Sequence, residues 1–321
     1  MPDTTRITAL DMLTTAGGSA YLAELYGKVI ENVQKNLVSA GMKNMDLSGD
    51  PVSGTVVAKR FKNASSASYG TARSAGAGTA VKADEVVVAI NVDKEIVEEL
   101  EEKDVRLYGV DGVLERRVAN HVLRMAAELD SAFFTEANTH AVAINQTGYS
   151  TIEDELEAII QECETTVNNF VDGVPRSMMN LTLSPAYYGK IRNALDKNAN
   201  NANINTDAEE FLTWHGVKAK SSVHLPSGCN YILQVDGAIA QPVMADQYRA
   251  EKIPLSNAYG IELFYHYGTK AVTPDLIFRP GVFTQAESYV SGTQYYTESS
   301  GVYSPVTITQ FEQGVTYYTM S

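Results

Sequence analysis

The chain has 321 residues, of which 44% are hydrophobic and 20% are charged, a composition that can support two or three domain-sized cores. Its 39 acidic residues outnumber its 25 basic residues, which gives a formal net charge of −14. This acidity argues against a protein that reads nucleic-acid sequence through a basic face, but not against one that merely encloses nucleic acid.

Two long amphipathic helices are predicted in the first half of the chain. Residues 17–40 carry one apolar stripe at helical spacing, and Gly41 is placed to end that helix. Apolar residues then recur every three or four positions, which predicts a spine helix at about 110–136. His121 borders this second stripe, so we expect a packing residue there rather than a catalytic one.

Between the two helices, the predicted strands at 54–61 and 85–92 flank a loop of Gly, Ala and Ser at 65–80. Hairpin loops usually have about two to five residues, so a loop this long is functional, disordered or wrongly assigned. It superficially resembles a phosphate-binding loop, but neither the lysine nor the helix that such a site needs follows it. The acid-rich residues 93–109 predict a solvated face of a short helix or strand rather than a metal site.

The second half of the chain mixes helices and strands. The sequence predicts a helix at 151–170 with a capped, acidic first turn, a buried strand at 177–183, and a helix capped by Ser184. From residue 216 onward the pattern is β-rich. The tail at 281–321 is rich in Tyr, Thr and Ser, and it predicts extended strands or an arm.

The sequence as given shows neither a transmembrane segment nor a signal peptide, and its two cysteines do not suggest a disulfide framework. No apolar run is long enough for a transmembrane helix, and the N-terminus lacks the basic start and apolar stretch of a signal peptide. The two cysteines, Cys163 and Cys229, predict free thiols in a reducing compartment, with Cys163 buried in a helix.

Residues that could carry chemistry are scarce. No known metal or nucleophile motif is present, and no partner at metal-ligand spacing accompanies the remaining histidines, His140, His215, His224 and His266. The best metal candidate is a segment similar to a calcium loop, with its ligand positions at Asp196, Asn198, Asn200 and Asp207. Asn201 stands where such loops have glycine, so an Asn-rich surface loop is favoured and no cofactor is expected.

The order of these elements resembles the HK97-type major capsid protein of tailed double-stranded DNA bacteriophages, an α+β fold, over nearly the whole chain. The resemblance is carried by the order and spacing of four segments rather than by one motif. These are the hairpin "GTVVAKRF…EVVVAINV", the spine "VDGVLERRVANHVLRMAAELDSAFF", "GVKAKSSVHLPSG" and the closing "YGIELFYHYGTKAVTPDLIFRP".

The resemblance implies a division of the chain into five regions. They are an N-terminal arm at 1–50, an extended hairpin loop at 51–92, a peripheral domain at 93–150 and 256–282, an axial α/β domain at 151–255, and a C-terminal extension at 283–321. The hairpin would reach over a neighbouring subunit, with the contact residues Lys59, Arg60, Lys62, Tyr69, Arg73 and Lys82. We also hypothesise that the C-terminal extension is a strand-forming arm that contacts a neighbour or a decoration protein.

The implied function is self-assembly into pentamers and hexamers of an icosahedral phage head, built in the bacterial cytoplasm around non-specifically held double-stranded DNA. The other implied partners are a portal and a scaffolding protein, the latter expected as a separate chain because only about 16 residues precede the first helix. We expect no enzymatic activity and no membrane. Some relatives form isopeptide cross-links from the hairpin; none is expected here, because no acceptor or catalytic acid is identifiable for Lys59, Lys62 or Lys82.

Three other functions remain open from the sequence. An encapsulin-like shell that houses an enzyme cargo would have the same fold without DNA. A surface adhesin would explain the Tyr- and Thr-rich tail, but it should carry an export signal. An enzyme with a nonstandard site would need a cluster of nucleophile, base or metal ligands that the sequence does not display.

Overall fold

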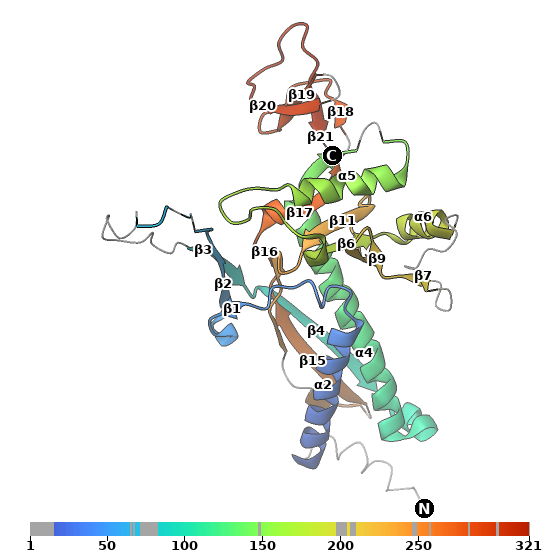
Figure 1. Ribbon diagram of the computed structural model, residues 1–321. Coiled ribbons are helices and arrows are strands. Elements are labelled where there is room, and N and C mark those ends of the chain that lie inside the picture. The colour runs from blue at the N-terminus through green and yellow to red at the C-terminus, as the bar shows by residue number, and fades with distance from the viewer. Residues whose placement is uncertain are drawn as a thin grey trace, which may run out of the picture. The chain divides into compact units, whose positions relative to one another are not determined.

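The computed structural model is described here for residues 16–64, 66, 68–70, 83–146, 149–196, 204–205, 210–245, 249–256, 258–281, 283–299 and 302–320 (Figure 1). The chain divides into two compact units, each assembled from three segments. The first unit consists of Met1–Arg60, Ala83–Glu136 and Ile239–Val272. The second consists of Phe61–Lys82, Ala137–Ala238 and Thr273–Ser321.

The first unit is built on a long antiparallel strand pair. Strand β4 (Val92–Leu100) pairs with β15 (Tyr259–Tyr267) along its whole length, and the other side of β15 pairs with β13 (Val243–Ala245) and β14 (Arg249–Lys252). Alternate residues of β15 are buried on one face, as the two-residue period of a strand requires. They are Tyr259, Ile261, Leu263, Tyr265 and Tyr267.

Two helices pack on this buried face, α2 (Ala16–Asn36) and the spine helix α4 (Glu102–His140) (Figure 1). They contribute Leu22, Leu25, Val29 and Val33 from α2, and Leu114, Val122, Met125 and Leu129 from α4. The last residues of α4, from Ala137 on, belong to the second unit. The apolar periodicity therefore identified both helices and their inner faces.

The predicted ends of these two helices are wrong. Helix α2 ends at Asn36 instead of at Gly41, because the backbone N–H groups of Val38 and Ser39 donate to the carboxylate of Asp130, at 2.9 and 3.1 Å, rather than continuing the helical ladder. Helix α4 is longer than the predicted 110–136 at both ends. It begins at Glu102, two residues after the end of β4.

The predicted hairpin is present as a three-stranded sheet of β1 (Leu47–Ser48), β2 (Thr55–Phe61) and β3 (Ala83–Ala89), with a 3₁₀ turn at Pro51–Ser53 between β1 and β2. Its second strand differs from the expected 85–92, since Val92 already belongs to β4. Most of the Gly/Ala/Ser loop lies outside the described residues. The root of the hairpin is a buried cluster of Val56, Ala58, Val88, Ala240 and Val272. Ala240 and the neighbour of Val272 come from a short pair, β12 (Ile239–Ala240) and β16 (Lys270–Ala271).

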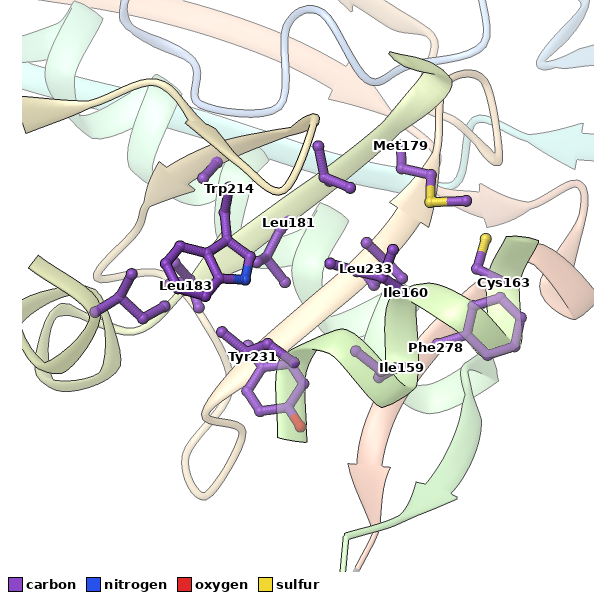
Figure 2. Packing of buried hydrophobic residues seen from close by; sticks show 14 of the residues in the cluster. Ile159, Ile160, Cys163, Met179, Leu181, Leu183, Trp214, Tyr231, Leu233 and Phe278 are labelled. Atoms are coloured by element: carbon purple, nitrogen blue, oxygen red, sulfur yellow. The ribbon is translucent and has the colours of Figure 1, made fainter. Parts of the chain in front are cut away.

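The second unit contains a mixed six-stranded sheet with the order β5-β17-β11-β6-β10-β9. The strands are β5 (Val142–Asn145), β17 (Ile277–Gly281), β11 (Tyr231–Val235), β6 (Met179–Leu183), β10 (Val217–Ser221) and β9 (Thr213–Trp214). Every residue of β6 and β11 is buried, which confirms a buried strand over residues 179–183 of the predicted 177–183. The first two predicted residues, Ser177 and Met178, are exposed, and they lie in a 3₁₀ turn instead. Figure 2 shows Ile159, Ile160 and Cys163 of α5 (Ile152–Glu164) packed with Leu181, Leu233 and Phe278 of the sheet.

Helix α5 confirms the predicted cap, since the N–H of Asp154 donates to Thr151 Oγ1 at 3.2 Å. The predicted extension of this helix to residue 170 is wrong. The helical ladder ends at Thr165, whose N–H still donates to the Gln161 carbonyl at 3.0 Å. Beyond it, Asn168 Oδ1 accepts the N–H of Phe170, a local side-chain bond in place of a helical one. Helix α6 (Pro185–Asp196) starts at its predicted cap, Ser184, whose Oγ accepts the N–H of Tyr187 at 3.4 Å.

Smaller elements complete the second unit: two 3₁₀ turns, Arg176–Met178 and Pro274–Leu276, and a short strand pair, β7 (Ile204–Asn205) and β8 (Glu210–Phe211).

The tail folds as a four-stranded antiparallel sheet with the order β18-β21-β19-β20. These strands are β18 (Phe283–Gln285), β21 (Tyr318–Met320), β19 (Tyr295–Ser299) and β20 (Val302–Val306). We call this segment, residues 283–320, the C-terminal module.

The C-terminal module has its own aromatic core. The fully buried Tyr295 packs edge-on against Phe311, with the ring centroids 5.2 Å apart, and Phe311 stacks on Tyr317 at 4.8 Å. The Tyr295 hydroxyl accepts the N–H of Val290 at 2.7 Å. The strands expected in the tail are thus confirmed, but they pair with one another instead of extending as an open arm.

Candidate functional site

Three large apolar side chains in the segments of the hairpin sheet of the first unit are exposed. Met45 lies just before β1, Val52 lies in the turn before β2, and Val87 lies on β3, and all three are exposed. Lys59 on β2 is also exposed. We call these four residues the hairpin surface. Large exposed apolar side chains, where they form a contiguous patch, are typical of a surface that binds protein.

The six residues predicted to contact a neighbour are distributed over both units. Lys59 forms a surface ion pair with Glu85 at 3.4 Å, and Arg60 is half-buried. Tyr69 is 91% exposed. Lys62 lies over the ring of Phe170 at 5.6 Å, so its ammonium group already has a contact within its own chain. Arg73 and Lys82 lie outside the described residues.

The root of the hairpin is fixed to the end of β15 at a position where only glycine fits. A Cβ atom on Gly268 would lie 1.9 Å from the carbonyl oxygen of Ala89, the last residue of β3. The N–H of Gly268 donates to the Pro242 carbonyl at 3.2 Å, and the N–H of Ile90 donates to the Gly54 carbonyl at 2.8 Å. The sequence indicated a "YG" turn at this point. It did not indicate that the glycine of this turn contacts the backbone at the root of the hairpin.

Strand β4 presents one acidic face to solvent and pairs its inward groups with the spine helix. Asp93, Glu95 and Glu99 are exposed. Glu98 binds Arg117 and lies 3.0 Å from Nε2 of the buried His121. The hydrogen bond from Arg117 lowers the pKa of Glu98, whereas burial lowers the pKa of His121. His121 is therefore the packing residue that the sequence predicted.

An ionic cluster that sequence reasoning missed joins α5 to the β9–β10 turn in the second unit. Arg176 donates to Glu157 at 2.7 Å, to Glu164 at 2.8 Å and to the carbonyl of His215 at 3.1 Å. The Arg176 hydrogen bond lowers the pKa of Glu157 to about 2. His215 also stacks on the buried Trp214, with the ring centroids 4.3 Å apart. The cluster contains no nucleophile and serves to fix these elements to one another.

The metal hypothesis falls mainly on residues that are not described. Asp196 is the last residue of α6, whereas Asn198, Asn200 and Asp207 lie outside the described residues. Among the residues that the structure does describe, no group of three or more His, Cys, Asp or Glu side chains is placed to hold a metal ion. In the same part of the chain, no helix is long and apolar enough to span a membrane. Cys163 is buried, Cys229 is half-buried, and both are free thiols.

The fold matches solved shell proteins. No family model matches the sequence, and no curated protein matches it. A structure from Mycobacterium phage Che8 superposes with a TM-score of 0.55 and 16% identity, covering 76% of this chain and 90% of that one. The capsid of cyanophage P-SCSP1u gives a TM-score of 0.53 with 13% identity over 75% of this chain and 85% of that one.

A virus-like particle also matches the fold. The virus-like particle from Pyrococcus furiosus gives a TM-score of 0.52 with 10% identity, covering 81% of this chain and 98% of that one. At these identities the likeness shows the fold alone. The chain has the mixed α+β fold of HK97-type capsid proteins, which confirms the fold inferred from its order of elements.

Proposed function

We propose that this chain is the repeating subunit of a closed protein shell, the icosahedral head of a tailed phage, in which pentamers and hexamers enclose double-stranded DNA. The observation that carries the proposal is the likeness to the Che8 structure, which extends over 90% of that chain. The net charge of −14 is compatible with this function. A strongly basic lining would bind nucleic acid before the shell was complete.

In this proposal the hairpin surface is the main contact with a neighbouring subunit. Met45, Val52 and Val87 would be buried in the assembled shell, which accounts for their exposure in the single chain. The basic residues Lys59 and Arg60 of one copy would meet the acidic outer face of the next copy's β4. Opposite charges of this kind set orientation and association rate more than affinity.

The other parts of the proposal are its partners and its setting. A separate scaffolding protein would direct assembly in the bacterial cytoplasm, a portal would occupy one vertex, and decoration proteins would bind the finished shell. In the proposed shell, the chain is divided into an N-terminal arm, an extended loop, a peripheral domain, an axial domain and a C-terminal extension. The chain would act as a structural protein without catalysis.

Negative-stain electron microscopy of the purified full chain tests the proposal. Closed shells, tubes or rings of five and six subunits are the expected particles. A stable monomer at high protein concentration, with and without co-expressed candidate scaffolding proteins, would refute it. Nuclease treatment of intact particles, followed by DNA extraction, then tests whether the particles enclose double-stranded DNA.

A matched pair of variants tests the hairpin contact. Val87→Ser changes an exposed residue of the hairpin surface, and Val223→Ser makes the same change at an exposed position of the second unit. We expect the first variant to lower the yield of closed particles by about ten-fold at an unchanged melting temperature, since losing one buried valine costs about 1.5 kcal/mol per contact. Equal yields for both variants would contradict the role of the hairpin surface.

A second candidate function is an encapsulin-like shell with an enzyme cargo. The specific observation in its favour is that the match covers 98% of the Pyrococcus furiosus virus-like particle chain. Mass spectrometry of particles purified from the native source distinguishes the two functions. A stoichiometric co-purifying enzyme without protected DNA would favour the cargo shell.

A further inference from the structure

The turn between β14 and β15 in the first unit holds a leucine in an unfavourable backbone conformation. The N–H of Ser256 donates to the carbonyl of Ile253 at 3.2 Å, which closes a four-residue turn with Pro254 and Leu255 in its middle. Leu255 has a φ of 60°, as the third residue of a type II turn requires. Glycine or asparagine usually takes this position, because the left-handed region is strained for residues with a larger side chain.

The strained leucine also faces solvent. The relative exposure of Leu255 is 109%, so its side chain contributes no buried area to the fold of its own chain. Pro254 beside it is exposed as well, and we call these two residues the β14–β15 tip. Strained backbone positions are concentrated at binding and switch sites, where a contact makes use of them. A fully exposed leucine in such a position therefore indicates a contact outside its own chain.

A groove that can receive an apolar side chain lies elsewhere in the same unit, between α2 and the spine helix α4. It has a volume of about 370 Å³, and its floor is formed by Leu25, Val118 and Val122. Leu123 lines it with 58% of its surface exposed. An apolar floor with a few polar groups around it and a volume of this order is typical of a binding site.

We propose that the β14–β15 tip of one copy inserts Leu255 into the α2–α4 groove of a second copy, an inference that rests on the proposed shell. Leu255 does not fill the groove of its own chain, because its side chain is fully exposed there. Tip and groove are two different surfaces, so each copy would give its tip to one neighbour and receive the tip of another. Contacts of this head-to-tail kind close into rings where the rotation between copies permits it.

The charges beside the two surfaces are complementary. Strand β14 carries Glu251 and Lys252 at the base of the tip, and both side chains are exposed. The rim of the groove carries Lys28 on α2 and Glu115 on α4. In one orientation of the inserted tip, Glu251 meets Lys28 and Lys252 meets Glu115, whereas the reversed orientation brings like charges together. Charge pairs of this kind select the orientation of a contact more than they raise its affinity.

A mixture of two single-cysteine chains tests the contact. One chain carries Leu255→Cys and the other carries Ala119→Cys, at an exposed position that lines the groove. Both have a Cys229→Ser background, in which the remaining Cys163 is fully buried. The control mixture replaces the first chain with Leu212→Cys, at a leucine of the second unit that is 72% exposed. Docking raises the effective concentration of the two thiols, so we expect about ten times more mixed disulfide than in the control.

A second variant separates the contact from the stability of the subunit. Leu255→Asn removes the apolar side chain and suits the turn, since asparagine adopts the left-handed region more readily than leucine does. We expect an unchanged or higher melting temperature together with about ten-fold fewer particles by electron microscopy. Leu212→Asn, the matched control, should leave the yield of particles unchanged.

Three results would overturn the inference. They are equal yields of mixed disulfide for the tip mixture and the control, a disulfide that joins two Leu255→Cys chains in preference to the mixed product, and an unchanged particle yield for Leu255→Asn. If wild-type particles form normally and any of these results appears, the tip contact is wrong and the shell proposal stands. A wild-type chain that stays monomeric under the same conditions would refute the shell proposal and this contact with it.

Discussion

Replacing Gly268 by alanine should loosen the root of the hairpin. The added Cβ would lie 1.9 Å from the Ala89 oxygen, 2.8 Å from the Ala89 carbonyl carbon and 3.2 Å from the Ile90 Cα atom. All three are backbone atoms, so no side chain can rotate away and the strands themselves must separate. Overpacking of this kind costs about 1–3 kcal/mol. The lower entropy of alanine in the unfolded chain offsets about 0.4–1 kcal/mol of this.

The net loss of about 1–2 kcal/mol should lower the melting temperature of Gly268→Ala by about 2–8 °C relative to the wild type, at about 2–4 °C per kcal/mol for a unit of this size. Gly189→Ala is the matched control. Gly189 lies inside α6 with no atom within 4 Å of the added Cβ, so alanine should stabilise that helix by about 1 kcal/mol. A lower melting temperature for Gly268→Ala together with a higher one for Gly189→Ala supports the steric argument. An unchanged or higher melting temperature for Gly268→Ala would refute it.

Three further predictions concern other parts of the fold. Arg176 lowers the pKa of Glu157 from 4.5 to about 2. The ionised Glu157 carboxylate therefore contributes its full stabilisation above about pH 4.5 and loses it as the pH falls toward 2. Glu157→Gln should flatten the dependence of the unfolding free energy on pH between these values. Asp130→Ala leaves the buried donors of Ser39 without their acceptor and should cost about 2–3 kcal/mol by urea unfolding, whereas an unchanged midpoint would contradict this. Tyr295→Ala empties the core of the C-terminal module and should make that module the first protease target while the melting of the rest is unchanged.

The fold could be predicted from the sequence where one periodicity extended over many residues. The apolar stripes of α2 and α4, the cap at Thr151 and the buried strand β6 all depend on local spacing, and the structure confirms them. The predictions of the helix ends were wrong for a physical reason. Helix α2 stops because Asp130, more than ninety residues away, accepts its next N–H groups, and no local pattern reports a partner that distant.

The candidate site was less accessible to sequence reasoning. Basic residues of the hairpin were named as contacts, but the apolar members of the hairpin surface were not, because Met45 and Val52 stand in segments that resemble ordinary turns. The ionic cluster of Arg176 was missed for the same reason as the helix ends, since Glu157, Glu164 and His215 become neighbours only after folding.

The hairpin separates the stability of the subunit from its capacity to assemble. Its root is buried in the first unit, against Ala240 and Val272, so a change there acts on the folded chain itself. Its surface exposes apolar side chains that contribute nothing to the single chain until a partner covers them. A root variant such as Gly268→Ala should therefore lower both the melting temperature and the yield of particles, whereas Val87→Ser should lower the yield alone. If both variants changed the two quantities in proportion, the hairpin would be a structural element of the subunit and the contact surface would have to lie elsewhere.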